Sequence, residues 1–351
     1  ESRRDPMDDR NFLKEESAVL KQYPINPYFA EDFGKVKKVY TNTGTYALKK
    51  IHPHESTDFI RHIQHLYQKG YNRIVPVYPA NDGRYAVLHN KSLYYLMPWM
   101  SNETREDQSQ RHQQLFRELA RMHTLSVKEL EISAEVKQEH YEKTLKEWEK
   151  EEEFINGFLE SCEDRVYMSP VELTFCLYYI QISQAIQFAK QKLESWNEKT
   201  KEQKKNRTVT LHGKVSPEHF LFDERGYGYF INFEKARQGS PIQDLLPFLA
   251  RSLKTQPKYG DEIIDWIYVY LKYFPFREDE MQLFMSYLAF PSGIIRVAEM
   301  YHQRKSEVDE RKFVQKLQRQ YWLLSNTGYV VTKIDEMEKQ KEQAKQEGAQ
   351  S

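Results

Sequence analysis

The sequence has few cysteines and no long apolar run, and both absences exclude whole classes of protein. Its 351 residues include two cysteines, Cys162 and Cys176, which cannot form a disulfide framework or a zinc site of the usual spacing. No apolar stretch approaches the roughly 18 residues that cross a bilayer. Residues 1–10 are charged and lack the apolar segment of a signal peptide. We therefore expect a protein without a membrane span that is made and kept inside a cell.

The sequence also lacks a net charge and a cysteine-supported histidine cluster. Lysine plus arginine equals aspartate plus glutamate, at 52 each, so no overall field attracts nucleic acid and we predict no nucleic-acid partner. The basic run at 197–207 is interpreted as a solvated connection. A metal cluster can be drawn from His52, His54, His62 and His65, but their polar surroundings favour ordinary surface histidines, and we predict no metal site.

The amino-terminal part predicts a small antiparallel sheet with one helix. Hydrophobic residues make up 39% of the chain, and a chain of this length usually folds as two domains or lobes. After a helical extension within residues 1–24, the turn Asn42-Thr43-Gly44 separates two alternating segments, which is a hairpin signal. Gly70 ends a predicted helix. The lobe at 25–100 is predicted to contain a helix at 56–69 and strands within 35–51 and at 75–77, 85–89 and 92–97.

The remainder is mainly helical and is interpreted as a larger lobe at 101–334, followed by a polar tail at 335–351 that frays. Apolar residues in it recur at the helical period. The predicted helices lie at 8–22 in the extension and, in the larger lobe, at 107–126, 133–161, 170–196, 242–253, 259–274, 278–289, 294–302 and 307–325.

One stretch interrupts the helices, a predicted strand, loop and hairpin at 208–234. Strands at 220–222 and 227–233 flank a turn that ends at Gly226. In the smaller lobe, Ala47 and Lys49 share one face of a strand because side chains alternate. An ammonium beside a small residue suits a nucleotide, although a solvated lysine on an exposed strand has the same pattern.

These motifs resemble the protein-kinase-like fold, in particular its aminoglycoside and choline phosphotransferase branch. His212-Gly213-Lys214 with His219 is similar to the branch's His-Gly-Asp-x-x-x-x-Asn loop, and Ile231-Asn232-Phe233-Glu234 to its Ile-Asp-Phe/Trp-Glu segment. Tyr46-Ala47-Leu48-Lys49 resembles the Val-Ala-Ile-Lys strand. The resemblance, which covers residues 25–325, implies an α+β fold with two lobes.

Further residues take roles from the same resemblance. It implies a nucleotide cleft beside Ala47 and Lys49, with Met97, Trp99 and Met100 lining the hinge where an adenine would stack. It also implies structural roles for His212, Glu234 and Asp244, the last of which lies in Pro241-Ile242-Gln243-Asp244-Leu245. Within the branch, the motifs Lys49-Lys50-Ile51-His52 and Ala120-Arg121-Met122-His123-Thr124 are most similar to the spore-coat kinase-like proteins of the CotS and YutH type, with the YutH type preferred.

Three positions depart from the branch in ways that matter for chemistry. Phosphoryl transfer requires a proton acceptor, metal ions on the phosphates and a cation. Lys214 stands where the branch has its catalytic aspartate, and an ammonium accepts no hydrogen bond. His219 and Asn232 replace two ligands of Mg²⁺ with an imidazole and a neutral amide. The predicted helix at 56–69 also lacks a central glutamate to orient Lys49.

The departures favour a catalytically impaired, kinase-like protein that acts as a structural or binding component, and the resemblance places it in the bacterial endospore coat after synthesis in the mother-cell cytoplasm. Its partners would be other coat proteins. No cofactor is expected. One alternative is a divergent small-molecule phosphotransferase that uses ATP, with Lys214 as a phosphate-binding cation and Glu234 or Glu218 as a ligand. Another is a switch that binds ATP without Mg²⁺ and without turnover.

Overall fold

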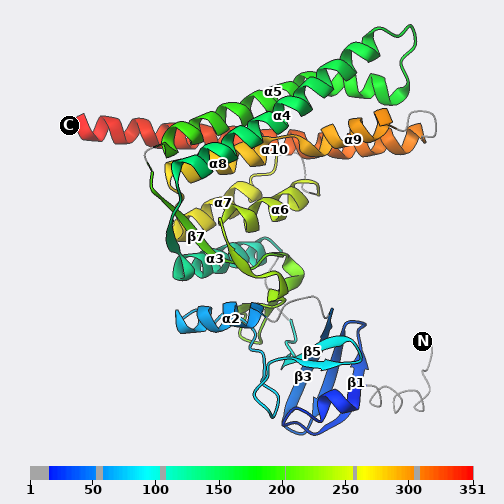
Figure 1. The fold of residues 1–351 in the computed structure, drawn as a ribbon, viewed down its shortest axis with the longest axis vertical. Coiled ribbons are helices and arrows are strands. Elements are labelled where there is room, and N and C mark those ends of the chain that lie inside the picture. The colour runs from blue at the N-terminus through cyan, green and yellow to red at the C-terminus, as the bar shows by residue number, and fades with distance from the viewer. Residues whose placement is uncertain are drawn as a thin grey trace. The chain divides into compact units, whose positions relative to one another are not determined.

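The chain divides by its backbone contacts into two compact units (Figure 1). The computed structural model describes residues 16–52, 58–102, 108–201, 203–255, 259–303 and 309–350. Unit 1 consists of Glu1–Val127 and Val209–Gly239, and unit 2 of Lys128–Thr208 and Ser240–Ser351. The segment at 209–239 thus groups with the sheet, whereas the sequence-based bounds assign it to the helical lobe.

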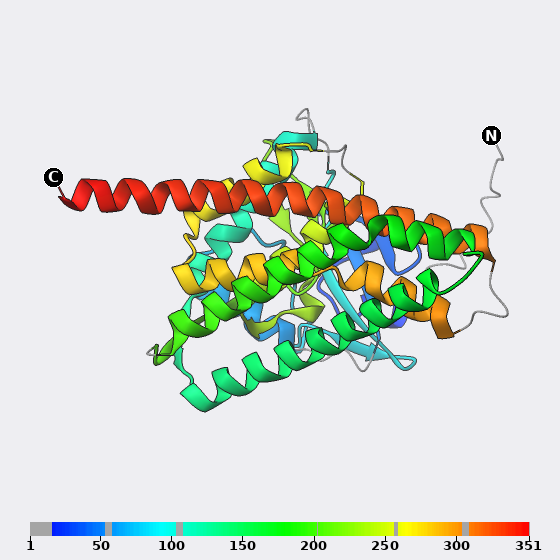
Figure 2. The same ribbon diagram turned by 90° about the horizontal axis from the view of Figure 1, so that it is seen from above.

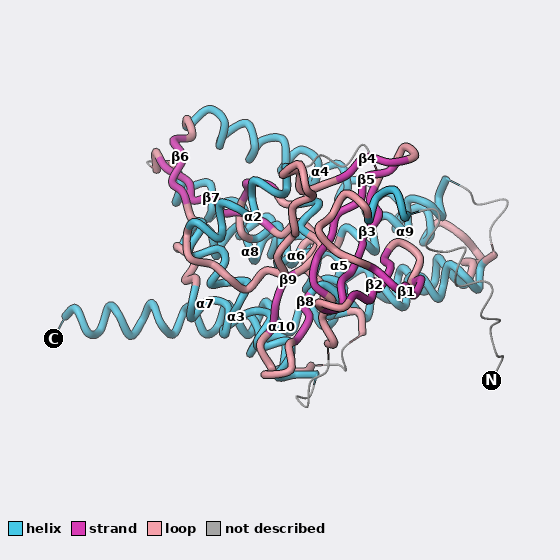
Figure 3. The backbone as a smooth tube through the Cα atoms, turned by 90° about the horizontal axis from the view of Figure 1, so that it is seen from below, coloured by secondary structure: helices cyan, strands magenta, loops and turns pink. Residues whose placement is uncertain are grey.

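Unit 1 is built on a five-stranded antiparallel sheet in the order β1-β2-β3-β5-β4, whose strands appear in magenta in Figure 3. The Asn42-Thr43 turn joins the second and third strands in the predicted register, in which Thr41 pairs with Gly44. The strands are β1 (Pro27–Asp32), β2 (Val36–Thr41), β3 (Gly44–Ile51), β4 (Val87–His89) and β5 (Ser92–Pro98).

In the sequence, α2 (Asp58–Gln68) lies between the strands β3 and β4 of the sheet, and α3 (Gln108–Ser126) follows the hinge. α2 buries Phe59, Ile60, Ile63 and Leu66 on one face, and Gly70 ends it with a φ of 83° that glycine adopts readily. The predicted starts of these helices, at 56–57 and 107, lie outside the described residues, as do 8–15 of the helix in the extension.

The rest of unit 1 comes from the stretch at 209–239. β8 (Phe220–Phe222) and β9 (Gly228–Phe230) form a hairpin, and β10 (Arg237–Gly239) pairs with the end of β7 (Lys205–Leu211). Two short 3₁₀ turns, η1 (Pro217–His219) and η2 (Phe233–Lys235), flank the hairpin.

Two strand predictions in unit 1 are wrong. Residues 75–77 form no strand, and only single bridges occur beside them, at Ile74 and Tyr78; Pro76 and Pro79 cannot donate the hydrogen bonds of a ladder. The strand predicted at 227–233 ends at Phe230, because Asn232 takes a left-handed conformation with a φ of 67°. β1 was not predicted.

Unit 2 is mainly helical, which together with the small sheet of unit 1 confirms the predicted α+β class. In Figure 2, α5 lies beside α4, α8 and α10, in agreement with their contacts. Its helices are α4 (Ala134–Glu163), α5 (Pro170–Thr200), α6 (Ile242–Leu253), α7 (Glu262–Tyr273), α8 (Glu278–Ala289), α9 (Ser292–Gln303) and α10 (Glu310–Gln350).

Local chemistry explains where the central helix of unit 2 begins. Ser169 caps α5, with its hydroxyl accepting from the Glu172 amide while the Glu172 carboxylate accepts from the Ser169 amide, and Pro170 occupies the first turn. α5 then buries Phe175, Ile182 and Ile186 in a core shared with α4, α9 and α10. The capping box and the apolar period therefore set both the start and the buried face of this helix.

The basic run at 197–207 is not a solvated connection throughout. Its first residues belong to α5, and residues 205–208 of β7 pair with β6 (Lys128–Glu131), a strand that was not predicted. Arg207 explains how charge is accommodated there: it forms an ion pair with Glu280 and lies 4.5 Å from the Phe274 ring. The prediction failed because the residues that pair with these charges are distant in the sequence.

The predicted polar tail at 335–351 is instead the continuation of α10, which runs to Gln350. Among the side chains that the structure describes, Ile334 is the last fully buried one, so the described part of the segment lacks apolar anchors as predicted, while its backbone is helical. Lys339 pairs with Asp335, and Lys341 with Glu338, one turn apart. Such pairs and strong helix formers maintain the helix beyond the core.

No described helix is long and apolar enough to cross a membrane. Cys162 and Cys176 are both free thiols.

Candidate functional site

A cavity of about 490 Å³ lies within unit 1, between β3 and the segment that follows the hairpin. It brings together Lys49, Lys214, Asn232 and Glu234, four of the residues that the sequence singled out. The space between them is open to a ligand. The described residues that line it are Gly34, Lys35, Lys49, Lys50, Ile51, His52, Ser92, Lys214, Asn232, Glu234 and Lys235.

Lys49 is held by residues from the other side of this cavity. Its ammonium forms an ion pair with the Glu234 carboxylate and donates to the Asn232 side-chain oxygen. Both members of the pair are well shielded, with side-chain exposures of 12% for Lys49 and 9% for Glu234. The carboxylate that orients the strand lysine therefore comes from η2.

Glu234 is ionised by its surroundings. Burial would raise the pKa of this carboxyl, but the charge of Lys49 and hydrogen bonds from Lys49 and Tyr95 outweigh burial and hold the pKa below its ordinary value. The Tyr95 hydroxyl donates to the carboxylate at 2.6 Å. Two donors thus already engage one carboxylate oxygen.

The loop between β7 and η1 is fixed by His212 and Gly213. The buried His212 ring donates from Nε2 to the Ile231 carbonyl (2.7 Å) and accepts the Lys214 amide at Nδ1 (3.2 Å). Gly213 has a φ of 79°, and a Cβ on it would lie 2.2 Å from the Lys235 carbonyl oxygen. Only glycine allows this close approach of the loop to η2.

Lys214 and His219 stand at opposite ends of the same loop. Lys214 projects an exposed side chain into the lining of the cavity, while its carbonyl accepts a hydrogen bond from His219 Nδ1 at 2.8 Å. Burial lowers the pKa of His219, as do the nearby charges of Lys214 and Lys49. His219 is therefore a neutral imidazole that braces the loop, and it does not line the cavity.

The backbone conformation at position 232 explains why an asparagine is found there. Its left-handed φ of 67° is strained for most side chains and is tolerated best by glycine, asparagine and aspartate. An asparagine here preserves the backbone that an aspartate would support, but it supplies no charge.

The cavity is strongly cationic. Among the residues that the structure describes, five lysines line it and Glu234 is the one carboxylate in the lining, already paired with Lys49. Lys35, Lys50 and Lys214 form no ion pair with any residue that the structure describes. Uncompensated positive charges around a cavity repel one another and attract an anion, which suits the phosphates of a nucleotide.

The lining is a poor fit for Mg²⁺, which prefers carboxylates in near-octahedral geometry. Glu234 and the Asn232 amide oxygen are the hard oxygen side-chain ligands at this point, and Lys49 occupies both. Among the described residues, no three His, Cys, Asp or Glu side chains gather as a metal site requires. His54, one of the four clustered histidines, lies outside the described residues.

The remaining predicted site residues lie elsewhere. Ala47 and Met97 are buried opposite each other in β3 and β5, and Trp99 packs on Phe33 at 5.6 Å. These residues and Met100 do not line the cavity, so their contact with an adenine stays a prediction. Asp244 belongs to unit 2, where it is buried in the first turn of α6.

Sequence reasoning missed three of the cavity's lysines, Lys35, Lys50 and Lys235. Lys50 directly follows Lys49 and Lys235 directly follows Glu234, so lysines flanking those motifs were the signal that could have found these two. Lys35 precedes β2, and no identified motif lies beside it.

The chain is similar to known proteins in both its sequence and its fold. Residues 28–270 match the model of the phosphotransferase enzyme family, whereas a comparison with curated sequences finds no match. An aminoglycoside phosphotransferase from Alicyclobacillus acidocaldarius has 14% identity and a TM-score of 0.69, with 96% of this chain and 97% of that chain covered. A spectinomycin phosphotransferase with ADP and spectinomycin has 11% identity and a TM-score of 0.52 over 93% and 100%.

A microcompartment-associated aminopropanol kinase is similar at 13% identity and a TM-score of 0.52, with 92% and 98% covered. At such identities the structures establish the fold, which is the kinase-like fold of the aminoglycoside phosphotransferases. The family model covers more than half of the sequence. The chain therefore belongs to the phosphotransferase enzyme family.

Proposed function

We propose that this protein is a catalytically impaired member of its family that binds the phosphate chain of ATP in the lysine-lined cavity without Mg²⁺. The observation that carries the proposal is the charge of the described lining residues: five lysines against one carboxylate, which Lys49 already neutralises. In the metal-dependent mechanism, divalent ions neutralise the phosphates. Here Lys35, Lys50 and Lys214 offer that neutralisation from side chains.

The same lining provides no good proton acceptor for transfer to a hydroxyl. Lys214 is an ammonium, and Glu234 is engaged by Lys49 and Tyr95. His219 is neutral and could accept a proton, but it lies outside the lining and binds the Lys214 carbonyl. These observations support binding with little or no turnover.

A second candidate is a divergent small-molecule phosphotransferase, and membership of an enzyme family favours it. In that case Lys49 would contact the phosphates, Lys214 would stabilise negative charge on the transferred group, and Glu234 would act as ligand. Glu218, the other carboxylate considered, is exposed and does not line this cavity.

Metal dependence separates the two candidates. In EDTA, we expect ATP to raise the melting temperature of the protein, because a ligand that binds the native state stabilises it. Adding Mg²⁺ should weaken binding, since the ion removes negative charge that the lysines recognise. Lys214→Ala or Lys50→Ala should weaken ATP binding about fivefold, equivalent to about 1 kcal/mol for one charge at the surface, as measured by titration calorimetry.

Lys69→Ala is the matched control, because Lys69 is an exposed lysine outside the cavity, and its affinity should equal that of the wild type. Stabilisation only when Mg²⁺ is present, together with ATP turnover that disappears in Lys49→Ala, would replace the first candidate with the second.

We further propose, from the sequence resemblance to the spore-coat kinase-like proteins, that the protein is a binding component of the endospore coat. The cavity is a poor fit for metal-dependent phosphoryl transfer, and this supports a role that needs no catalytic turnover. A fluorescent fusion expressed in a sporulating bacterium should concentrate around the forespore. Fluorescence that remains evenly spread through the mother-cell cytoplasm would argue against this location.

A further inference from the structure

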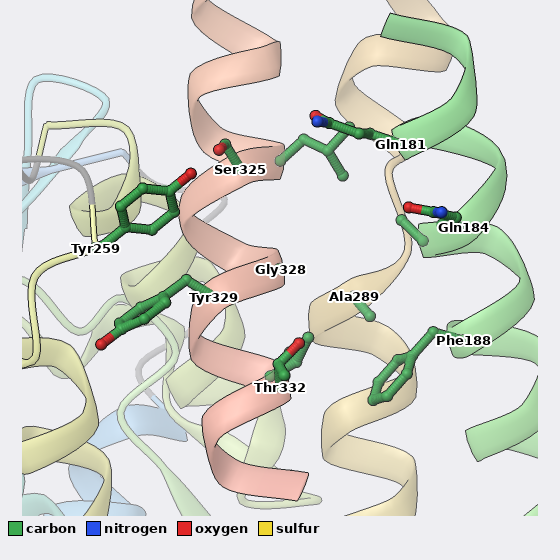
Figure 4. Close-up of a pocket in the computed structure, with 12 residues that line it drawn as sticks. Gln181, Gln184, Phe188, Tyr259, Ala289, Ser325, Gly328, Tyr329 and Thr332 are labelled. Atoms are coloured by element: carbon green, nitrogen blue, oxygen red, sulfur yellow. The ribbon is translucent and has the colours of Figure 1, made fainter. Parts of the chain in front are cut away.

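A cavity of about 370 Å³ lies in unit 2, away from any residue assigned a function above (Figure 4). Its volume is within the range of about 300 to 1,000 Å³ typical of small-molecule sites. None of the lining residues that the structure describes is charged, although charged residues make up 30% of the chain. The lining comes from α5, α8, α10 and the residues before α7: Gln181, Gln184, Ala185, Phe188, Tyr259, Ala289, Leu324, Ser325, Gly328, Tyr329, Val331 and Thr332.

Gly328 opens the middle of this cavity. Figure 4 shows it on α10 with Tyr259 and Tyr329 to one side and Gln184 and Phe188 to the other. No heavy atom lies within 4 Å of the place where its Cβ would stand, so close packing does not require a glycine. Glycine in a helix interior is less favourable than alanine, and the open path across α10 is what the missing side chain provides.

Two tyrosines form one wall. Tyr259 has a left-handed φ of 58°, a strained conformation for a bulky residue. Its amide donates to the side-chain oxygen of the buried Asn326 at 3.3 Å, and its ring lies 5.2 Å from that of Tyr329. Strain of this kind collects at functional sites, and here it presents an aromatic ring, 55% exposed as a residue, at the edge of the cavity.

The polar groups of the other walls are available to a ligand. The side chains of Gln181, Gln184, Ser325 and Thr332 make no hydrogen bond with any residue that the structure describes. By contrast, Ser195 and Thr200 of α5 donate to carbonyls one turn earlier, at 3.0 and 2.9 Å. Two amides and two hydroxyls together offer both donors and acceptors.

We propose that this cavity binds an uncharged, polyhydroxylated small molecule of the size of a mono- or disaccharide. The tyrosine rings present apolar faces with polar tips, against which the C–H face of a sugar ring packs. The amides and hydroxyls of the lining form hydrogen bonds with sugar hydroxyls. A ligand that both donates and accepts hydrogen bonds should therefore bind best. A charged ligand would find no counter-ion among the described lining residues, and a purely apolar one would leave those amides desolvated.

The probes are N-acetylglucosamine and glucosamine, which share a ring and differ in charge, together with maltose. Saturation-transfer NMR on the full chain should show saturable binding of N-acetylglucosamine or maltose in the millimolar range, and at least tenfold weaker binding of glucosamine. Gly328→Leu, which fills the path across α10, should weaken binding more than tenfold. Gly157→Leu is the control, because Gly157 is an exposed glycine of α4 with equally open surroundings outside the cavity.

Gln184→Ala, a change at an exposed position, serves as a second variant if Gly328→Leu fails to fold, and it should weaken binding at least threefold. The proposal is overturned if neither neutral sugar binds the wild type, if glucosamine binds equally well, or if both leucine variants retain wild-type affinity. ATP binding is measured in parallel, so that failure here is distinguished from failure of the function proposed for the lysine-lined cavity.

Discussion

Gly213→Ala should destabilise the protein by at least about 3 kcal/mol, a large effect for a single added methyl group. The substitution combines two costs. A non-glycine residue at a φ of 79° costs roughly 1 to 2 kcal/mol, and the new Cβ would stand 2.2 Å from the Lys235 carbonyl oxygen. Because backbone must move to relieve that overlap, the loop should separate from η2. Urea unfolding measures the loss of stability.

Binding should suffer together with stability, because Lys214 and Lys235 line the same cavity from the two segments that Gly213 holds together. We expect ATP affinity in EDTA to fall more than tenfold in Gly213→Ala. Gly226→Ala is the matched control: it has a φ of 78° but nothing within 4 Å of its Cβ position. It should lose only roughly 1 to 2 kcal/mol and keep its affinity. Equal destabilisation of the two variants would show that the close approach has no energetic weight.

The sequence predicted those elements whose signals are local. The turn before Gly44, the end of α2 at Gly70 and the bounds of α6 and α8 follow from glycines and apolar period within single segments. The strand β6 was missed for the opposite reason. It consists of Lys128–Glu131 with every residue exposed, and nothing in those four residues indicates the partner strand that orders them.

The candidate site divides in the same way. Lys49, Lys214, Asn232 and Glu234 could be found from motif spacing, and the structure places them around one cavity. That Glu234 pairs with Lys49 could not be derived, because the two residues are 185 positions apart and only the folded sheet and hairpin bring them together. Because α2 contains no glutamate, the sequence did not identify the ion-pair partner of Lys49. The structure shows that this partner is Glu234 of η2.

Lys49→Met should cost about 3 to 5 kcal/mol at neutral pH, the typical loss when one partner of a buried ion pair is removed. Methionine retains the length and apolar stem of lysine, so packing changes little. What remains is the Glu234 carboxylate, 9% exposed, with Tyr95 as a donor but without its ion-pair partner. ATP binding should also weaken, because one of five cavity lysines is lost.

The pH dependence of stability identifies the cause, because the substitution reverses its sign at Glu234. In the wild type the pKa of Glu234 lies below its ordinary value of 4.5, so its contribution is present above that value and is lost as pH falls through the folded-state pKa. In Lys49→Met burial dominates and should raise this pKa above 4.5. Stability from Glu234 should then be greatest at low pH and decline as pH rises through the raised pKa.

Glu234→Gln in the Lys49→Met background tests this assignment, since an amide fills the same space without a charge to desolvate. The double variant should recover most of the loss at pH 7, and the difference between single and double variants should shrink toward pH 4. His219 also has a depressed pKa and gains a proton on acidification, but it is common to both variants, so their difference isolates Glu234. If the double variant is as unstable as Lys49→Met at every pH, the unpaired carboxylate is not the cause, and the loss of the Lys49 hydrogen bond to Asn232 would have to explain the effect.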